Sequence, residues 1–270
     1  MLRLAIRVQR EHAELVLAEL LELAPSGVEE VELAEAVEYA VYGAAGELPA
    51  LPDLTAAAGA ALIDVRTEEI AADWHERWRQ FHKPLVLHDR ITVRPPWEPR
   101  GATPIDLVID PGQAFGTGAH ATTRLCLELM LALKPAAGFV DLGCGSGILA
   151  IAAAALGWAP VTALDNDPAS LSATRDNAAA NGAAIAVHRH DLRTDPPAVA
   201  PTVAANLLAP LLLAWAGRLR EAPRLPERVI AGGLLAHEAS AVAAGFAALG
   251  LIERQRRQHG DWAALLLSSP

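Results

Sequence analysis

The stretch DLGCGSG, at residues 141–147, decides how this sequence folds. The apolar segment GFVDL leads into it and GILAIAAAALG follows it, so the pattern predicts a strand, a glycine turn and a helix. Glycines at such a turn adopt unusual φ values and let a ligand approach the backbone closely. In open parallel sheets, ligands bind at the carboxyl ends of the strands. The turn is therefore the first candidate binding site.

Strand–helix alternation continues from this turn to the end of the chain. Strands are predicted at residues 160–165, 184–190, 201–207 and 227–233, and helices at 168–182, in the leucine-rich segment that ends at Leu219, and at 236–250. The last segment predicts two strands joined by a turn at 259–261. Alternating units of this kind form a mainly parallel sheet covered on both faces. The expected fold class is therefore α/β and Rossmann-like, with a terminal antiparallel hairpin.

The N-terminal part of the chain follows a different pattern. Strands are predicted at residues 2–8, within 28–43 and at 61–70, and helices at 11–23 and 51–61. Glu11 begins the first of these helices, and its charged and apolar residues fall on opposite faces. The rhythm predicts a compact α+β domain of the ferredoxin-like kind.

An aromatic helix and a proline-rich segment separate the two patterns. Trp74, Trp78 and Phe81 share one face of the predicted helix, which either binds a ligand or, as we favour, packs into a domain junction. The proline-rich segment at residues 94–104 sustains neither a helix nor a central strand. We therefore expect domains at residues 1–93 and 110–270, with a linker at 94–109.

Composition narrows the classes of function. Hydrophobic residues make up 52% of the chain and its formal net charge is −10. The charge favours an acidic enzyme that meets a basic protein over a surface that recognises nucleic acid. Cys126 and Cys144 build neither a disulfide framework nor a metal site, which fits a cytoplasmic protein. No membrane span is expected, because no apolar run reaches about 18 residues.

A second glycine-rich stretch, DPGQAFGTGAHATT at residues 110–123, also runs into an apolar segment that predicts a helix. Two such turns in tandem suggest that both wrap the same ligand. The nicotinamide fingerprint G-x-G-x-x-G/A fails at residues 143–148, because Ile148 holds its last position. The spacing G-x-G-x-G after an acidic strand end resembles instead the S-adenosylmethionine turn of class I methyltransferases.

Polar residues at the ends of the predicted strands are further candidates. Asp165 lies about 20 residues past the turn, where a carboxylate accepts hydrogen bonds from both ribose hydroxyls of such a ligand. Asp167 precedes Pro168 and is expected to cap a helix. Asp191 either reaches the adenine amino group or is an ordinary loop carboxylate. Asn206 either faces the methyl group and the incoming nucleophile or merely forms a turn.

Several other polar residues also have two interpretations. His120 and Thr122 either contact the ligand or cap the helix that follows. Cys144 is expected to be a small loop filler rather than a nucleophile. His188 and His190 lie next to a strand end without metal partners, so no metal site is expected.

Four stretches together resemble one family: DPGQAFGTGAHATTRLCLELM, DLGCGSGILAIAAAALG, ALDNDPASLSATRDNAAANG and ANLLAPLL. They are similar to the methyltransferases of bacterial large-subunit ribosomal protein eleven, the PrmA type. The stretch DWHERWRQFHKPLVLHDRITVRPPW resembles that family's domain junction. The match covers nearly the whole chain and is weakest over the first 70 residues.

The resemblance implies a ferredoxin-like domain that binds the ribosomal protein, a catalytic domain, and a short linker between them. It implies transfer of methyl groups from S-adenosylmethionine to lysine side-chain amines and the N-terminal amine of large-subunit ribosomal protein eleven. The donor contacts that it implies are Thr122, Gly143, Asp165 and Asn206, with Asn206 as the catalytic candidate. The expected donor site as a whole comprises Phe115, Thr117, His120, Thr122, Gly143, Gly145, Gly147, Asp165, Asp191 and Asn206. The chain departs from the family where Ala121 replaces a common proline and where Leu207 replaces a common isoleucine.

Other functions stay open at this point. A methyltransferase of nucleic-acid amino groups typically carries Asn or Asp followed by Pro-Pro-aromatic, whereas Leu207 and Leu208 follow Asn206 here. The methyl acceptor could also be another protein. A ribosome-assembly factor that binds the donor without catalysis would keep the same donor contacts, so only turnover distinguishes it.

Overall fold

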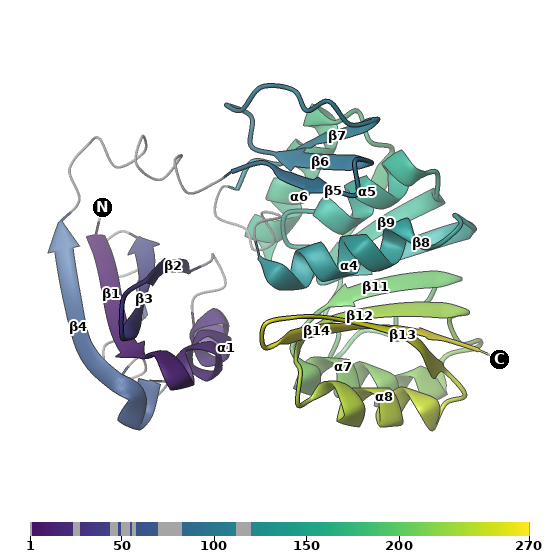
Figure 1. The fold of residues 1–270 in the computed structure, drawn as a ribbon. Helices are drawn as coiled ribbons and strands as arrows, with labels where there is room; N and C mark the ends of the chain where they lie inside the picture. The colour runs from purple at the N-terminus through teal and green to yellow at the C-terminus, as the bar shows by residue number, and fades with distance from the viewer. Residues whose placement is uncertain are drawn as a thin grey trace. The chain divides into compact units, whose positions relative to one another are not determined.

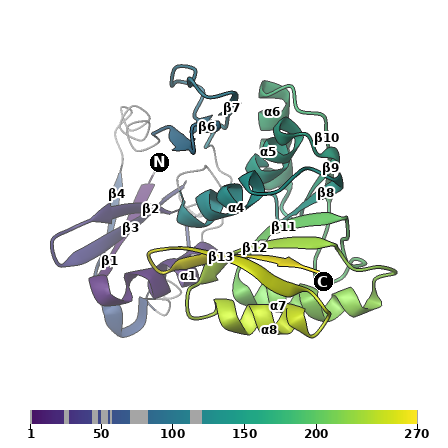
Figure 2. The ribbon, with the colours of Figure 1, turned by 45° about the vertical axis from the view of Figure 1, so that its right-hand side comes forward.

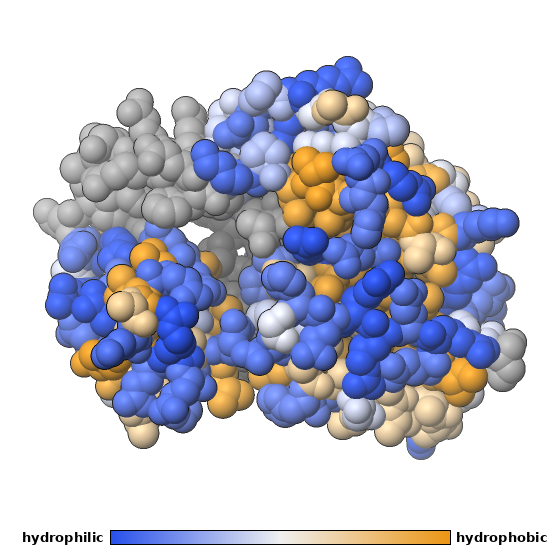
Figure 3. Space-filling model, in the orientation of Figure 1, coloured by the Kyte–Doolittle hydropathy of each residue, from blue (hydrophilic) through white to orange (hydrophobic). Residues whose placement is uncertain are grey.

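The computed structural model describes residues 2–23, 28–43, 48–49, 55, 58–69, 83–111 and 120–269. The chain divides into two compact units, Met1–Phe81 and His82–Pro270, both drawn in Figure 1. Hydrophilic residues cover much of the visible face of each unit, with hydrophobic residues interspersed (Figure 3). Among the described residues, no helix is both long and apolar enough to cross a membrane.

The N-terminal unit contains a four-stranded antiparallel sheet with the strand order β2-β3-β1-β4. Its elements are β1 (Leu2–Gln9), η1 (Arg10–His12), α1 (Ala13–Leu23), β2 (Glu29–Glu32), β3 (Ala36–Gly43), η2 (Gly59–Ala61) and β4 (Leu62–Glu69). The predicted first strand and first helix are confirmed. Most of residues 51–61, and the aromatic residues Trp74, Trp78 and Phe81, lie outside the described residues.

The alternation of β1 sorts its side chains onto the two faces of this sheet. Leu4, Ile6 and Val8 are buried on one face, as the period of two residues requires. Arg3 and Arg7 lie on the other face, where their Nη2 atoms donate to the two carboxylate oxygens of Glu38 at 2.6 and 2.8 Å. Burial opposes ionisation of Glu38, but the two arginines outweigh it and lower the pKa of that carboxyl.

The C-terminal unit is built on a seven-stranded sheet with the order β10-β9-β8-β11-β12-β14-β13. Its strands are β8 (Ala137–Leu142), β9 (Ala159–Asp165), β10 (Ile185–Arg189), β11 (Thr202–Asn206), β12 (Arg228–Leu235), β13 (Ile252–His259) and β14 (Trp262–Ser268). Neighbouring strands run parallel from β10 to β12, and β14 runs antiparallel to both of its neighbours. The prediction of a mainly parallel sheet with a terminal antiparallel hairpin is confirmed.

Helices cover both faces of this sheet (Figures 1 and 2). One face carries α4 (Ala121–Leu131), α5 (Ile148–Leu156) and α6 (Pro168–Ala180); the other carries α7 (Ala209–Arg218), continued by η3 (Leu219–Glu221), and α8 (Ala239–Ala247). Asp167 caps α6, since its carboxylate accepts from the backbone N–H groups of Ala169 and Ser170. The capping role predicted for Asp167 is confirmed.

A small three-stranded sheet precedes the large one, and the sequence patterns did not predict it. It consists of β5 (Leu85–Leu87), β6 (Ile91–Arg94) and β7 (Ile105–Val108). Residues 94–109, expected as a linker, therefore include β7 and belong to the C-terminal unit, and the two units divide between Phe81 and His82. The prolines all lie in the loop between β6 and β7, and strands of three or four residues are too short to show periodicity.

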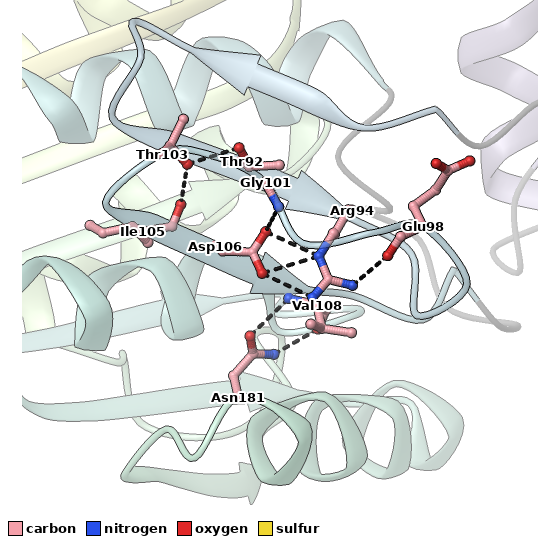
Figure 4. A network of polar contacts seen from close by, with 9 residues as sticks. All are labelled: Thr92, Arg94, Glu98, Gly101, Thr103, Ile105, Asp106, Val108 and Asn181. Carbon is pink, nitrogen blue, oxygen red and sulfur yellow. Dashed lines mark hydrogen bonds and ion pairs between the residues drawn. The ribbon is translucent and has the colours of Figure 1, made fainter.

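A nearly buried ion pair holds this loop against β7 (Figure 4). The Arg94 guanidinium donates to both carboxylate oxygens of Asp106, at 2.9 to 3.0 Å, and to the carbonyl oxygen of Glu98 at 2.7 Å. The backbone N–H of Gly101 also donates to Asp106. Burial opposes ionisation of Asp106, but these donors outweigh it and lower the pKa of Asp106. Residues 94–109 are thus a braced segment.

Candidate active site

The turn after β8 depends on glycine at several positions. Gly143, Gly145 and Gly147 have φ angles of 75°, 52° and 81°, in the left-handed region that other residues rarely adopt. A Cβ on Gly143 would lie 2.4 Å from Leu207 Cδ2, and one on Gly147 would lie 2.8 Å from Thr174 Cγ2. The turn therefore needs glycine both for its backbone conformation and for its packing against Leu207 and Thr174, and it lies at the carboxyl end of β8.

Asp165 ends β9 beside this turn. Its Oδ2 accepts from the backbone N–H of Gly145 at 2.9 Å, and its Oδ1 accepts from that of Asp167 at 3.0 Å. These two bonds fix the orientation of the carboxylate. A carboxylate has about four acceptor positions, so two remain for a ligand's hydroxyl groups. The geometry thus suits the predicted ribose contact, which stays a prediction.

Helix α6 joins the two glycine stretches. Asn177 accepts from the backbone N–H of Asp110 at 2.9 Å and donates to the carbonyl oxygen of Ser146 at 2.9 Å. Thr174 donates to the carbonyl oxygen of Gly145 at 2.9 Å. Asn177 is 3% exposed, so its amide links the first residue of one stretch to the turn of the other. Phe115 and Thr117, expected to close over the ligand, lie outside the described residues.

Asn177 and its neighbour on the same helix face, Asn181, are site-supporting residues that the sequence patterns did not predict. The amide of Asn181 accepts from the backbone N–H of Val108 at 2.8 Å and donates to the carbonyl oxygen of the same residue at 2.6 Å (Figure 4). Thr174, Asn177 and Asn181 recur at helical spacing among small residues. From this spacing alone one could have inferred a polar helix face that binds other parts of the protein rather than solvent.

The N-terminus of α4 meets the end of β11. His120 caps α4, because its Nδ1 accepts from the backbone N–H of Thr122 at 3.4 Å. The Thr122 hydroxyl lies 2.8 Å from the same Nδ1. Asn206 Nδ2 donates to Oγ1 of Thr122 at 3.2 Å and of Thr123 at 3.4 Å. His120 and Thr122 therefore do serve as helix-terminal residues, and they also connect to the catalytic candidate Asn206.

Asn206 carries an acceptor that the described part of the protein leaves unused. Its Oδ1 is buried and has no hydrogen-bond partner there. The oxygen lies beside Gly232 on β12, where a Cβ would come within 2.9 Å of it. The preceding residue, Ala205, pairs with Leu142, so Asn206 and the glycine turn lie at the same edge of the sheet. The fold thus brings Asn206 next to Gly143.

Asp191 follows β10 and is engaged in a local turn. Its Oδ1 accepts from the backbone N–H of Arg193 at 2.9 Å, and its own N–H donates to Asp195 Oδ2 at 2.8 Å. The preceding residue, His190, donates its backbone N–H to the carbonyl oxygen of Asp165. These contacts support the interpretation of Asp191 as a loop carboxylate, and the adenine contact stays a prediction.

Burial sets the protonation of several groups around the turn. It raises the pKa of Asp141, whose carboxyl is 1% exposed, to about 7. It also lowers the pKa of His120 to about 4, so this imidazole is neutral at pH 7. Burial raises the pKa of the Cys144 thiol, which packs 3.2 Å from Thr174 Oγ1 and suits the predicted role as a filler. The described residues contain no group of three His, Cys, Asp or Glu placed to hold a metal ion.

Comparison with known proteins identifies a family and several relatives to which this chain is similar. The family described as "Ribosomal protein L11 methyltransferase (PrmA)" matches residues 2–269. A protein named ribosomal protein L11 methyltransferase from Geobacter metallireducens is 40% identical over 196 residues, covering 72% of this chain and 65% of that protein. Its namesake from Chloroflexus aurantiacus is 37% identical over 237 residues, covering 76% and 72%. The chain covers just under two thirds of the length of several of these relatives, for example 65% of the protein from Geobacter metallireducens and 66% of its namesake from Pelobacter propionicus.

A solved structure supports the fold. The crystal structure of ribosomal protein L11 methylase from Lactobacillus delbrueckii subsp. bulgaricus aligns with a TM-score of 0.60 at 31% identity, covering 69% of this chain and 98% of that chain. The strand order and the glycine turn described above agree with a class I methyltransferase sheet. From the match over residues 2–269, we conclude that this chain belongs to the PrmA family of ribosomal protein L11 methyltransferases.

Proposed function

We propose that this chain transfers methyl groups from S-adenosylmethionine to amines of ribosomal protein L11, namely lysine side chains and the N-terminal amine. One observation carries the proposal: in a chain of the PrmA family, the glycine turn, Asp165 and the unpartnered Asn206 Oδ1 lie along one edge of the sheet. This edge is where open α/β sheets bind ligands.

The residues present fit the methyl donor. Gly143 and Gly147 give the turn its left-handed backbone and let Leu207 and Thr174 pack against it, since a side chain there would collide with them. This tight turn after β8 suits a contact with the amino-acid part of the donor. The acceptor positions left on Asp165 suit its ribose hydroxyls. When bound, the donor supplies a methyl group already activated by a sulfonium.

The protein's own part in such a reaction is alignment of an amine. A lysine amine has an ordinary pKa near 10.4 and must lose a proton before it attacks. Desolvation in a protein site favours the neutral form. Asn206 Oδ1 is a neutral acceptor that can orient an amine N–H without binding a proton itself. Holding the reactants in a productive geometry is then the main source of rate.

We further propose that the N-terminal unit is a ferredoxin-like domain that recruits the protein substrate. Its antiparallel order β2-β3-β1-β4, with α1 between β1 and β2, supports the ferredoxin-like assignment. Its arginines already neutralise Glu29, Glu32 and Glu38. Glu19, Glu30 and Glu35 are exposed carboxylates outside these ion pairs. These three would attract a basic partner, with apolar contacts then fixing the complex.

The geometry around Asn206 weighs against a nucleic-acid substrate. Leu207 follows it, and the Leu207 side chain occupies the space beside Gly143 Cα. An aromatic residue for stacking a base is absent from this position. The chain's formal net charge of −10 also disfavours a surface that tracks phosphates.

The deciding experiment is mass spectrometry of L11 after incubation with the chain and S-adenosylmethionine. We expect mass increments of whole methyl groups on lysine and N-terminal amines. Donor binding without any methylation of L11 would favour the assembly-factor alternative, and methylation of a different protein or of RNA would replace the proposed substrate. A reaction without donor is the matched control.

A further inference from the structure

The amide of Asn206 is held in one of its two possible orientations. Its Nδ2 donates to the hydroxyl oxygens of Thr122 and Thr123, at 3.2 and 3.4 Å, so both of its protons are directed at α4. Turned by 180°, the amide would direct Oδ1 at the same hydroxyls and lose its unused acceptor. The orientation of the amide therefore depends on whether the Thr122 hydroxyl accepts a hydrogen bond from Asn206 or donates one to it.

The protonation state of Nδ1 in His120 determines the direction of that hydrogen bond. A backbone N–H can only donate, so the N–H of Thr122 at 3.4 Å identifies Nδ1 of His120 as an acceptor without a proton. The Thr122 hydroxyl lies 2.8 Å from this Nδ1 and donates to it in the tautomer that carries its proton on Nε2. Its lone pairs are then left for the N–H of Asn206. The chain of donors runs in one direction, from Asn206 through Thr122 to His120.

Trp262 packs against the imidazole of His120. Its ring meets that of His120 edge to face, with centroids 5.0 Å apart and planes at 71°. Trp262 begins β14 and is 4% exposed. A residue from the last strand of the sheet thus restricts the plane of the imidazole, and the hydrogen bond from the N–H of Thr122 selects the ring orientation that brings Nδ1 toward α4.

We propose that His120 is a positioning residue for the methyl-transfer reaction: through the Thr122 hydroxyl it fixes the Asn206 amide so that Oδ1, and not the NH₂ group, is left for the reacting amine. This inference rests on the proposed function. His120 acts in this role through Asn206 rather than through contact with the methyl donor. The role requires an acceptor at the position of Nδ1, and the position of Nε2 is irrelevant to it.

Two amide substitutions distinguish an acceptor at the position of Nδ1 from an acceptor at the position of Nε2. In His120→Asn the side-chain oxygen can take the place of Nδ1, whereas in His120→Gln it reaches toward the place of Nε2. We expect His120→Asn to keep most of the wild-type kcat, and His120→Gln and His120→Leu to lose about 10- to 100-fold in kcat with little change in donor Kd. Circular dichroism and thermal melting establish that each variant is folded.

Thr122 provides an independent test. Thr122→Ser keeps the hydroxyl and is expected to keep kcat, whereas Thr122→Val removes it at nearly constant volume and is expected to lower kcat as His120→Leu does. The double variant H120L/T122V should be no worse than either single variant, because both break one chain of hydrogen bonds. Additive losses would overturn the relay.

Nuclear magnetic resonance of the ligand-free protein gives a readout besides activity. Long-range ¹⁵N–¹H correlation should show a neutral His120 ring with its proton on Nε2, and side-chain NH₂ protons of Asn206 that exchange slowly with water. In His120→Leu these protons should exchange faster, and in His120→Asn they should stay protected. A proton on Nδ1 would overturn the inference, as would restoration of kcat by Gln but not Asn. Failure of the wild-type chain to methylate L11 would instead overturn the proposed function and leave this readout valid.

Discussion

At the scale of single residues, the candidate site contains polar side chains that still have hydrogen-bond acceptor positions left after their bonds within the protein. Asp165 receives two backbone N–H groups and keeps acceptor positions, and the side-chain oxygen of Asn206 has no partner among the described residues. The buried Asn206 Oδ1 is costly without a ligand, because an unsatisfied buried polar atom carries a desolvation penalty, whereas the half-buried Asp165 is open to solvent in part. Each of them should therefore contribute to binding or to reaction, and the two contributions are separable.

Replacing Asp165 by alanine should weaken binding of S-adenosylmethionine. A hydrogen bond to a charged group contributes about 1.5–3 kcal/mol, so we expect a loss of roughly ten- to a hundredfold in affinity. Titration calorimetry on the folded variant measures it. Asp167→Ala, which removes only the cap of α6, is the matched control and should bind the donor normally. Unchanged affinity in Asp165→Ala would rule out the ribose contact.

Replacing Asn206 by alanine should act on turnover rather than on donor affinity. An interaction made mainly in the transition state appears in kcat, and loss of amine alignment is expected to lower it about 10- to 100-fold. Single-turnover methylation with saturating donor measures this step directly. If the variant matches wild type, Asn206 is only a turn residue.

The raised pKa of the buried Asp141 carboxyl leads us to expect that the free energy of unfolding depends on pH. Burial raises its pKa in the folded chain to about 7 from an ordinary value of 3.8. The folded state therefore loses stability relative to the unfolded chain as pH rises from 3.8 through about 7. Asp141→Asn, whose oxygen can still accept from the N–H of Ala150, should remove this loss. We expect the Tm difference between the ligand-free variant and wild type to grow in the variant's favour from pH 5 to 8, and a constant difference would contradict it.

At the scale of elements, α6 organises the site although it contributes no predicted ligand contact. Asn177 links residue 110 to the glycine turn, and Asn181, one helical turn later, links the same helix to β7. The small sheet β5-β6-β7 is braced by Arg94 and Asp106 and leads directly into the first glycine stretch. One helix face thus binds both the start of the first stretch, at Asp110, and the turn of the second, at Ser146.

Asn177 and Asn181 form a matched pair for testing this coupling. Each alanine variant leaves backbone groups unpaired and should lower the free energy of unfolding by about 1–3 kcal/mol. Only Asn177→Ala also frees the glycine turn, so it should weaken donor binding several-fold more than Asn181→Ala does. Denaturant unfolding and titration calorimetry give the two quantities. Equal donor affinities in the two variants would show that the link to Ser146 does not matter for binding.

At the scale of the whole molecule, the division between Phe81 and His82 separates the proposed donor site from the proposed recruitment of L11. A cut at the proline-rich segment would remove β5 and β6 and leave Asp106 without Arg94. A chain that begins at His82 keeps that ion pair and both anchors on α6. It is therefore the proper truncated protein for comparison with the full chain.

The truncated chain should bind S-adenosylmethionine as the full chain does, yet methylate intact L11 with a lower kcat/KM. Exposed charges are screened over about 8–10 Å at 0.1–0.15 M salt, so kcat/KM of the full chain should fall as salt rises. The measurement is kcat/KM for both proteins at two salt concentrations. An intact kcat/KM in the folded truncated chain would exclude recruitment by the N-terminal unit. If the salt effect alone is missing, Glu19, Glu30 and Glu35 are an ordinary solvated face.

Much of the fold was predictable from sequence because its signals are local. The glycine turn, the order of strands and helices, the cap at Asp167 and the strand end at Asp165 all follow from a few neighbouring residues. The small sheet was not predictable, since its strands are short and β6 and β7 meet across a loop rich in proline. The linker expected at 94–109 was misplaced for the same reason.

The sequence by itself determined the class of sheet, the family resemblance and the candidates along the strand ends. Only the tertiary structure decided which residues meet: Trp262 with His120, Thr122 with Asn206, and Asn177 with both glycine stretches. Periodicity and backbone preferences are set by residues adjacent in the chain. A hydrogen bond between Asn206 and Thr122, 84 positions apart, depends instead on how α4 packs on the sheet, and no local pattern records that packing.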